Sequence, residues 1–181
     1  MKKFSKAAVV ALVAAVALGL AGCAPGSGAT RTTQSLGPVS KSVGSGPITL
    51  TVWDQNTDGG MDDAQKQLNA AFEKKYPNIT VKRVSRAFTD LKTTLKLALS
   101  GSNPPDVVQA NQGYPDMGAF VKAGLLRPVD DYAGLYGWKQ YFPSGLLKLN
   151  SFSTDGATWQ GDTLYGVSQT GELVGDRKSV V

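Results

Sequence analysis

Acidic and amide side chains at alternate positions could bind either a metal ion or a small solute. The stretch VWDQNTDGGMDDAQ, residues 52–65, places Asp54, Asn56 and Asp58 two residues apart and follows them with Gly59. Oxygen ligands at this spacing, followed by glycine, are typical of the first half of a calcium-binding loop. The same side chains could line a binding cleft, because carboxylates accept hydrogen bonds and amides both accept and donate them.

The rest of this stretch favours a loop between a strand and a helix. Position twelve of a calcium loop would be Gln65, whose amide supplies one oxygen where a glutamate supplies two. The entering segment also has a strand pattern, where the calcium motif has a helix. Asp62 and Gln65 instead match a capping box at the start of a helix that contains Ala64. We therefore expect no metal and no cofactor here, and a helix capped by Asp62.

The composition excludes the commonest hydrolytic mechanisms. The chain contains no histidine among its 181 residues, which excludes Ser-His-Asp and Cys-His catalysis and imidazole metal ligands. Asp130 and Asp131 are adjacent carboxylates, a pattern more typical of a helix start than of the acid pair of a glycosidase. We therefore predict that the protein is not an enzyme.

Alternating strand and helix patterns must position the polar side chains. Strands are predicted over residues 48–53, 78–84 and 106–110, the last apolar enough to be central in its sheet. Apolar residues at helical spacing between and after these strands are Met61, Ala64, Leu68, Ala71 and Phe72, then Phe88, Leu91, Leu95, Ala98 and Leu99, then Met117, Phe120 and Val121 before a terminating Gly124. This order predicts an α/β fold with a mostly parallel sheet and helices on both faces. Ligands of such sheets bind beyond the carboxyl ends of the strands.

The N-terminal residues are typical of an exported, lipid-anchored protein. The chain begins with basic residues, followed by an apolar run over residues 7–20 that is too short to span a bilayer. This pattern predicts a signal peptide over residues 1–22. Leu20-Ala21-Gly22-Cys23 resembles the lipobox of bacterial lipoproteins, in which the cysteine becomes lipidated. Residues 23–47 are predicted to be the lipidated cysteine and a flexible tether, because they are rich in Gly, Ser, Thr and Pro. We expect the protein at the extracellular face of a bacterial cell membrane.

The charge pattern excludes a nucleic-acid surface. The formal charge of +5 includes Lys2, Lys3 and Lys6 of the signal peptide, without which 16 basic and 14 acidic residues remain, a charge of +2. The remaining charges are interspersed and lack interleaved aromatic residues, as expected for a solvated surface.

Five stretches in order resemble the family 1 extracellular solute-binding proteins of ATP-binding-cassette (ABC) importers, the maltose-binding-protein-like group. They cover residues 48–175 and read ITLTVWDQ, LNAAFEKKYPNITVKRV, GSNPPDVVQANQG, FVKAGLLRPVDDYA and GDTLYGVSQTGELVG. The resemblance implies the N-terminal lobe of a two-lobed, type II periplasmic-binding-protein-like fold. It also implies a monomer that binds a small solute, commonly a sugar or oligosaccharide, and presents it to the permease subunits of the transporter.

The resemblance also places a set of residues at the solute. They follow the first strand, follow the third strand, or lie shortly after Gly166, and are Trp53, Asp54, Gln55, Asn56, Asp58, Asn111, Gln112 and Glu172. Trp53, Trp138 and Trp159 are candidates to cover the apolar face of a sugar, although packing in the core is an alternative for each. A surface-anchored carbohydrate-active enzyme, using Asp54, Asp58 and Glu172, and a non-catalytic adhesive surface domain remain as alternatives.

The C-terminal residues depart from the family pattern. After GELVG the family continues into a further strand, whereas this chain reads DRKSVV. We expect residues 176–181 to be a non-native tail of a truncated sequence and the second lobe to be missing. One wall of a cleft encloses little of a ligand, so binding of the solute is expected to be weak.

Overall fold

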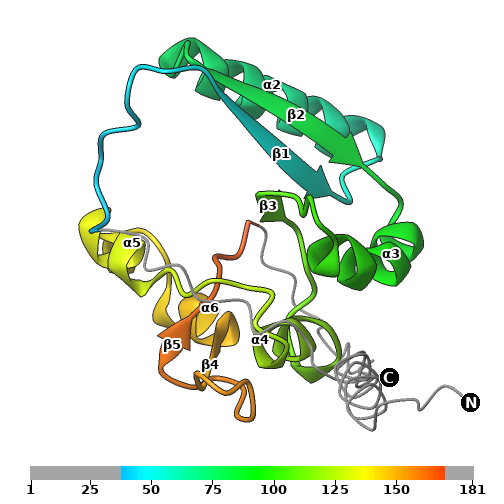
Figure 1. Ribbon diagram of the computed structural model, residues 1–181, viewed down its shortest axis with the longest axis vertical. Coiled ribbons are helices and arrows are strands. Elements are labelled where there is room, and N and C mark those ends of the chain that lie inside the picture. Colours follow the sequence, from blue (N-terminus) through cyan, green and yellow to red (C-terminus); the bar gives the residue numbers. More distant parts are fainter. Residues whose placement is uncertain (1–37, 170–181) are drawn as a thin grey trace, which may run out of the picture. The chain divides into compact units, whose positions relative to one another are not determined.

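Three parallel strands form the sheet that positions the candidate site. The computed structural model describes residues 38–169, and all elements named below lie within this range. Strands β1 (Ile48–Asp54), β2 (Ile79–Ser85) and β3 (Val107–Val108) pair in parallel in the order β2-β1-β3 (Figure 1). This arrangement confirms the predicted α/β class and its parallel sheet.

Strand β3 differs from the prediction of a longer, central strand. It contains two residues, and among residues 38–169 it lies at the edge of the sheet beside β1. Backbone hydrogen bonds extend the contact on both sides, from Asp106 N to Thr51 O at 2.9 Å and from Gln109 N to Trp53 O at 2.8 Å. Val107 is 51% exposed, so its apolar character alone was no sign of a central position.

The two long helices cover opposite faces of the sheet. Trp53 pairs in register with Val84 and Val108, and it packs against the buried leucines of α3 (Phe88–Ser100). The neighbouring position in β2 is Arg83, whose side chain points to the other face and contacts α2 (Gly59–Lys75). Side chains alternate between faces along a strand, which places the two helices on opposite sides.

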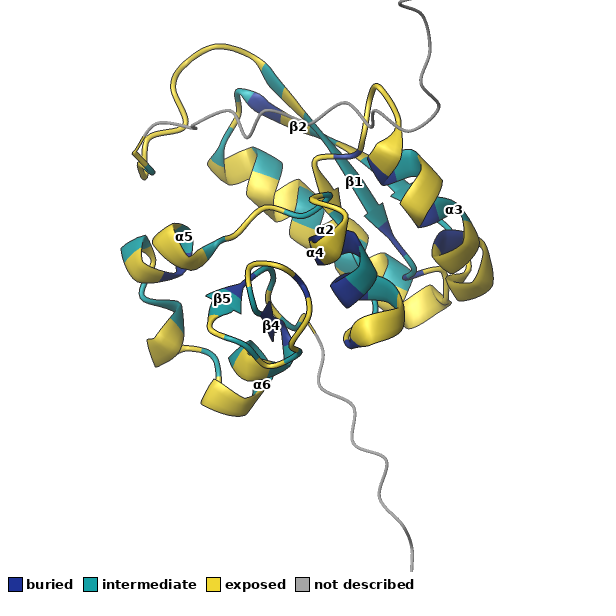
Figure 2. Ribbon diagram, turned by 60° about the horizontal axis from the view of Figure 1, so that its bottom comes forward, coloured by how far each residue is buried: buried dark blue, intermediate teal, exposed yellow. Residues whose placement is uncertain are grey.

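Helix α2 begins earlier than predicted and turns a polar face to the sheet. Its N-cap is Asp58 and not Asp62, so the predicted capping box is wrong. The residues of the predicted apolar stripe are all exposed, with Leu68 at 59% and Phe72 at 37%. Polar residues make the contacts instead, because Arg83 and the edge of β2 offer them charged and backbone partners. Figure 2 shows α2 in the colours of exposed and intermediate residues, whereas α3 carries buried residues.

Short elements complete the described chain. They are a π-helical turn η1 (Tyr114–Gly118), α4 (Ala119–Lys122), α5 (Asp130–Leu135), η2 (Trp138–Gln140), α6 (Ser144–Leu149), and an antiparallel pair of β4 (Ser151–Phe152) and β5 (Thr163–Leu164). Helix α5 starts at Asp130 and Asp131, as predicted. Gly124, with φ +64°, follows α4, and Leu125 N donates to Phe120 O at 2.9 Å, which confirms the predicted helix end.

Two apolar clusters hold these elements together. The first contains Leu91, Leu95 and Leu99 of α3 with Phe120 of α4. The second contains Met117, Val121 and the fully buried Phe152. The first cluster lies directly beneath the carboxyl ends of β1 and β3, so it supports the residues of the candidate site.

Several predicted features lie outside the described residues. They are the signal peptide, Cys23, the first part of the tether, Glu172 and the tail over residues 176–181. Residues 38–47 form neither helix nor strand, and the Asn78 side chain donates hydrogen bonds to the carbonyls of Gly44 and Gly46. None of the helices between residues 38 and 169 combines the length and apolar character needed to cross a bilayer.

Candidate functional site

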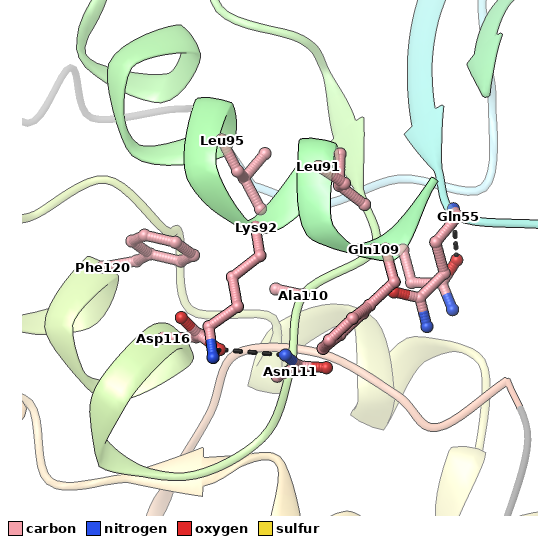
Figure 3. Close-up of a pocket in the computed structure, with 10 residues that line it drawn as sticks. Gln55, Leu91, Lys92, Leu95, Gln109, Ala110, Asn111, Asp116 and Phe120 are labelled. Carbon is pink, nitrogen blue, oxygen red and sulfur yellow. Dashed lines mark hydrogen bonds and ion pairs between the residues drawn. The ribbon is translucent and has the colours of Figure 1, made fainter. Parts of the chain in front are cut away.

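The carboxyl ends of β1 and β3 and the start of α3 surround a small depression lined by polar and apolar residues. Gln55 follows β1, and Gln109 and Asn111 follow β3. Asp116 of η1 and Lys92 of α3 face them, as Figure 3 shows. Its cavity volume of about 10 Å³ has room for roughly one water molecule, so a sugar would rest on it and not inside it.

Side-chain hydrogen bonds fix the amides of this depression. The Gln109 side-chain oxygen accepts from Gln55 N at 3.0 Å. The Asn111 side-chain nitrogen donates to Asp116 Oδ2 at 2.9 Å, and Lys92 Nζ lies 3.9 Å from the same oxygen (Figure 3). Asp116 therefore orients both the Asn111 amide and the Lys92 ammonium group.

Asp54 is buried next to the depression and is bound by an arginine. The residue is 4% exposed. Its carboxylate accepts from Arg83 Nε at 2.5 Å and from Arg83 Nη2 at 2.8 Å, and Oδ1 also accepts from Asn56 N at 2.9 Å. These bonds raise the pKa of Arg83 above its ordinary value, and the hydrogen bonds to Asp54 are the main cause.

Asn56 is held beside Asp54 through its backbone and its side chain. Its carbonyl accepts from Arg83 Nη2 at 2.8 Å and from Ser85 Oγ at 3.1 Å. Its side-chain nitrogen donates to Gln65 Oε1 at 3.3 Å. The residue is 4% exposed, and its side-chain oxygen Oδ1 has no hydrogen-bond partner within the described part of the chain.

The remaining predicted ligand residues do not gather at one point. Asp58 is exposed at the N-cap of α2. The Gln112 side chain donates to Ser168 Oγ at 3.0 Å and to Asn150 Oδ1 at 3.4 Å, in a separate group of polar residues. Of the predicted set, Gln55 and Asn111 line the depression, and Asp54 and Asn56 lie on the same loop as Gln55.

Each tryptophan packs against the protein. Trp53 contacts the first apolar cluster, and the Arg86 guanidinium carbon lies 4.6 Å from the centre of its ring. Trp159 packs against the second cluster and donates from Nε1 to Leu149 O at 2.9 Å. Trp138 makes an edge contact with Phe142 at 6.4 Å between ring centres.

Two aromatic residues, Phe120 and Phe88, line the depression, and of these Phe88 is exposed. It is 48% exposed and is the first residue of α3. The sequence pattern assigned it to the apolar stripe of this helix and so missed it. Its position directly after a strand end is the signal that could have found it, because the first turn of such a helix lies at the ligand-binding edge of the sheet.

A second cavity lies away from the strand ends. It has a volume of about 650 Å³ and is lined by residues of α5, η2, α6 and the segment around β5. Part of its charged lining already has partners, because Lys148 Nζ donates to Gly161 O and lies 3.5 Å from Asp162, and Asp130 accepts from Leu164 N. The depression at the strand ends has partly exposed amides and the exposed aromatic residue Phe88, as a solute site needs, so it is the better candidate despite its small volume.

The Arg83 bonds bear on the calcium interpretation. Asp54, the first oxygen ligand of the possible calcium loop, is bound to a guanidinium. Within residues 38–169, no three or more acidic or cysteine side chains are arranged to hold a metal ion.

The charged network gives a prediction for acid stability. The pKa of Asp62 is lowered from 3.8 by hydrogen bonds, first from Lys66 and then from Arg83. A carboxylate whose pKa is lower in the folded protein than in the unfolded chain stabilises the fold at pH values above the unfolded pKa. This stabilisation is lost as the pH falls through the pKa of the folded protein. We therefore expect Asp62→Asn to flatten the decline in stability below about pH 4, measured by urea unfolding at several pH values. Asp63→Asn is the matched control, and equal flattening in both variants would contradict the assignment.

Comparisons with known proteins agree with this geometry. A family model described as bacterial extracellular solute-binding protein matches residues 53–167. An uncharacterized ABC transporter extracellular-binding protein of Pyrococcus horikoshii is 36% identical over 85 residues, which are 45% of this chain and 19% of that relative.

Solved structures share the fold of the described residues. CpMnBP1 with mannotriose bound has a TM-score of 0.54 at 22% identity. A structure from work on xylan utilization by the thermophilic bacterium Caldanaerobius polysaccharolyticus has a TM-score of 0.56 at 23% identity. Each comparison covers 66% of this chain and 28% of the solved one, so the chain spans less than a third of their length. The likeness confirms the predicted type II periplasmic-binding-protein fold over part of one lobe. Because the family model covers most of the described residues, the chain belongs to the bacterial extracellular solute-binding proteins.

Proposed function

We propose that this protein binds a sugar or oligosaccharide and delivers it to the permease of an ABC transporter. The observation that carries the proposal is the group of amide side chains at the carboxyl ends of β1 and β3, with the exposed ring of Phe88 beside them. Sugar hydroxyls donate and accept hydrogen bonds, which amides match, and a ring covers the apolar side of a sugar. A fold neighbour with mannotriose bound supports the same class of solute.

The proposed roles of the site residues follow from their contacts. Gln55, Asn56 and Asn111 supply hydrogen bonds to hydroxyl groups, and Phe88 stacks on the ring. No catalytic role is proposed, because Asp54 is paired with Arg83 and Asp116 is bonded to Asn111 beside Lys92. Asp58, Gln112 and Glu172 remain proposed ligand residues on the basis of family resemblance.

The location of the protein is part of the proposal. Residues 1–22 serve as the signal peptide, and a lipid on Cys23 holds the protein at the extracellular face of the membrane by residues 23–47. A monomer on such a tether can approach the permease while it stays attached, because a segment rich in Gly and Ser behaves as a flexible coil.

A titration with saccharides tests the proposed function. NMR spectra of the 181-residue chain with mannotriose, xylotriose and chitotriose detect even weak binding. We expect at least one of them to shift the amide signals of Gln55 and Asn111. Asn111→Ala should weaken that binding about tenfold, the effect of one lost hydrogen bond of ~1.4 kcal/mol. Asn103→Ala is the matched control, because Asn103 is exposed in the loop that precedes β3. The absence of shifts with all three saccharides would contradict a sugar as solute.

A further inference from the structure

Arg83 joins three separate elements around the loop that follows β1. Its Nε and Nη2 bind Asp54 at the end of β1, and its Nη1 donates to Asp62 of α2 at 2.6 Å. Nη2 also donates to the carbonyl of Asn56. The side chains of Arg83 and Asp54 are 12% and 6% exposed, so water screens this contact little.

The loop is held from both sides of Asn56. Asp54 accepts a hydrogen bond from its backbone nitrogen, and Arg83 donates one to its carbonyl. The planar guanidinium binds these partners in a fixed geometry, which a lysine could not reproduce. Gln55 lies between Asp54 and Asn56, which the bonds of Arg83 hold in place. The position of Gln55 in the depression is therefore fixed as well.

The side chain of Asn56 is oriented by the same arrangement. Its nitrogen donates to Gln65 Oε1, and Gln65 Nε2 in turn donates to Asn69 Oδ1 at 2.9 Å. These bonds decide which atom of the Asn56 amide is the oxygen. That oxygen is buried, with no partner among residues 38–169, and a buried acceptor is normally satisfied by a donor.

A purely stabilising role explains the ion pair poorly. Buried ion pairs contribute little net stability, and apolar residues of similar size often replace them without loss. An apolar pair would not supply the hydrogen bonds that Asp54 and Arg83 make to the backbone of Asn56.

We propose that Arg83 and Asp54 are positioning residues of the solute site, which act through Asn56 and Gln55 and do not contact the solute. This assignment rests on the proposed function for its effect on binding, while the effect on the loop stands without it. It also gives Asp54 a role different from the direct contact that the family resemblance implied.

The test compares two variants of the pair with a matched control. Arg83→Lys keeps the charge and loses the planar geometry, and the double variant Asp54→Leu with Arg83→Met replaces the ion pair by apolar side chains. Asp62→Asn removes the charge of another partner of Arg83, whose side chain contacts Lys66 and not the backbone of Asn56. Each is made in the 181-residue chain and measured for melting temperature, for hydrogen exchange of the Asn56 amide, and for binding of mannotriose by NMR.

We expect the double variant to keep its melting temperature, to speed Asn56 amide exchange about tenfold and to weaken mannotriose binding about tenfold, a change of ~1.4 kcal/mol. Arg83→Lys should change the Asn56 exchange rate and mannotriose binding in the same direction as the double variant. Asp62→Asn should leave the exchange rate and the binding unchanged. Unchanged exchange in the double variant, or an equal effect of Asp62→Asn, would overturn the proposal. Lost binding with unchanged exchange would instead make Asp54 a direct ligand.

Two further outcomes remain decisive. If the double variant fails to fold, Arg83→Lys alone decides the positioning role: a faster Asn56 exchange in that variant supports the proposal, and an unchanged rate contradicts it. If the unaltered chain binds no mannotriose, that result counts against the choice of solute, and the exchange rates alone decide the positioning role.

Discussion

Replacing Gly161 by alanine is expected to lower the free energy of unfolding by about 3 kcal/mol, the upper part of the range for overpacked sites. A Cβ atom at this position would lie 2.2 Å from Ser153 N and 2.4 Å from Phe152 C. Both neighbours are backbone atoms, so no side-chain rotation relieves the clash. Phe152 is fully buried in the second apolar cluster, and any shift of its backbone disturbs that cluster. Urea unfolding followed by tryptophan fluorescence measures the change.

Gly134→Ala is the matched control for this substitution. Gly134 lies in helix α5, and a Cβ there meets no atom within 4 Å. Alanine is favoured over glycine in a helix by about 0.5–1 kcal/mol, so this variant should be equally or more stable than the unaltered protein. A similar loss of stability in both variants would contradict the close approach at Gly161.

The spacing of apolar residues predicted those parts of the fold whose contacts are made by residues close together in the sequence. Leu91, Leu95 and Leu99 recur at helical spacing, and all three are buried in α3. The parallel direction of the strands followed from the alternation of strand and helix, because parallel strands need a crossover connection, whereas the place of β3 at the edge of the described sheet did not. The rule that ligands bind beyond the carboxyl ends of strands then brought Gln55 and Asn111 to the same depression.

Contacts between distant segments could not be predicted from such patterns. Helix α2 carries an apolar stripe, yet its contact with the sheet is made by Asp62, whose partner Arg83 is 21 residues away. The pairing of Arg83 with Asp54 spans 29 residues. Neither residue has a periodicity that reveals the other, so Asp54 at a strand end was indistinguishable from a ligand residue. The same limit applies to the tryptophans, since a core contact and a cleft contact leave the same sequence pattern.

The proposed site therefore combines residues of two kinds. Gln55 and Asn111 present amides where the topology of the sheet places ligands, and both belong to the set that the sequence predicted. Arg83 is proposed to act on Gln55 through Asp54 and Asn56, and only the three-dimensional contacts identify it. Specificity for a solute depends on both kinds, because a hydrogen-bonding group discriminates between solutes only when its position is fixed.

The support of the site from below gives the last prediction, that Leu95→Ala lowers the free energy of unfolding by about 2–5 kcal/mol. Leu95 is 2% exposed, packs in the first apolar cluster, and also lines the depression that contains Asn111 and Asp116. The same truncation at Leu97, which is 79% exposed on the same helix, should change stability by less than about 0.5 kcal/mol. Urea unfolding of both variants measures the difference. Because the cavity left by Leu95→Ala opens directly beneath the depression, this variant should also speed amide exchange at Asn111, which Leu97→Ala should leave unchanged. Equal unfolding curves for the two variants would show that the first cluster does not support the site.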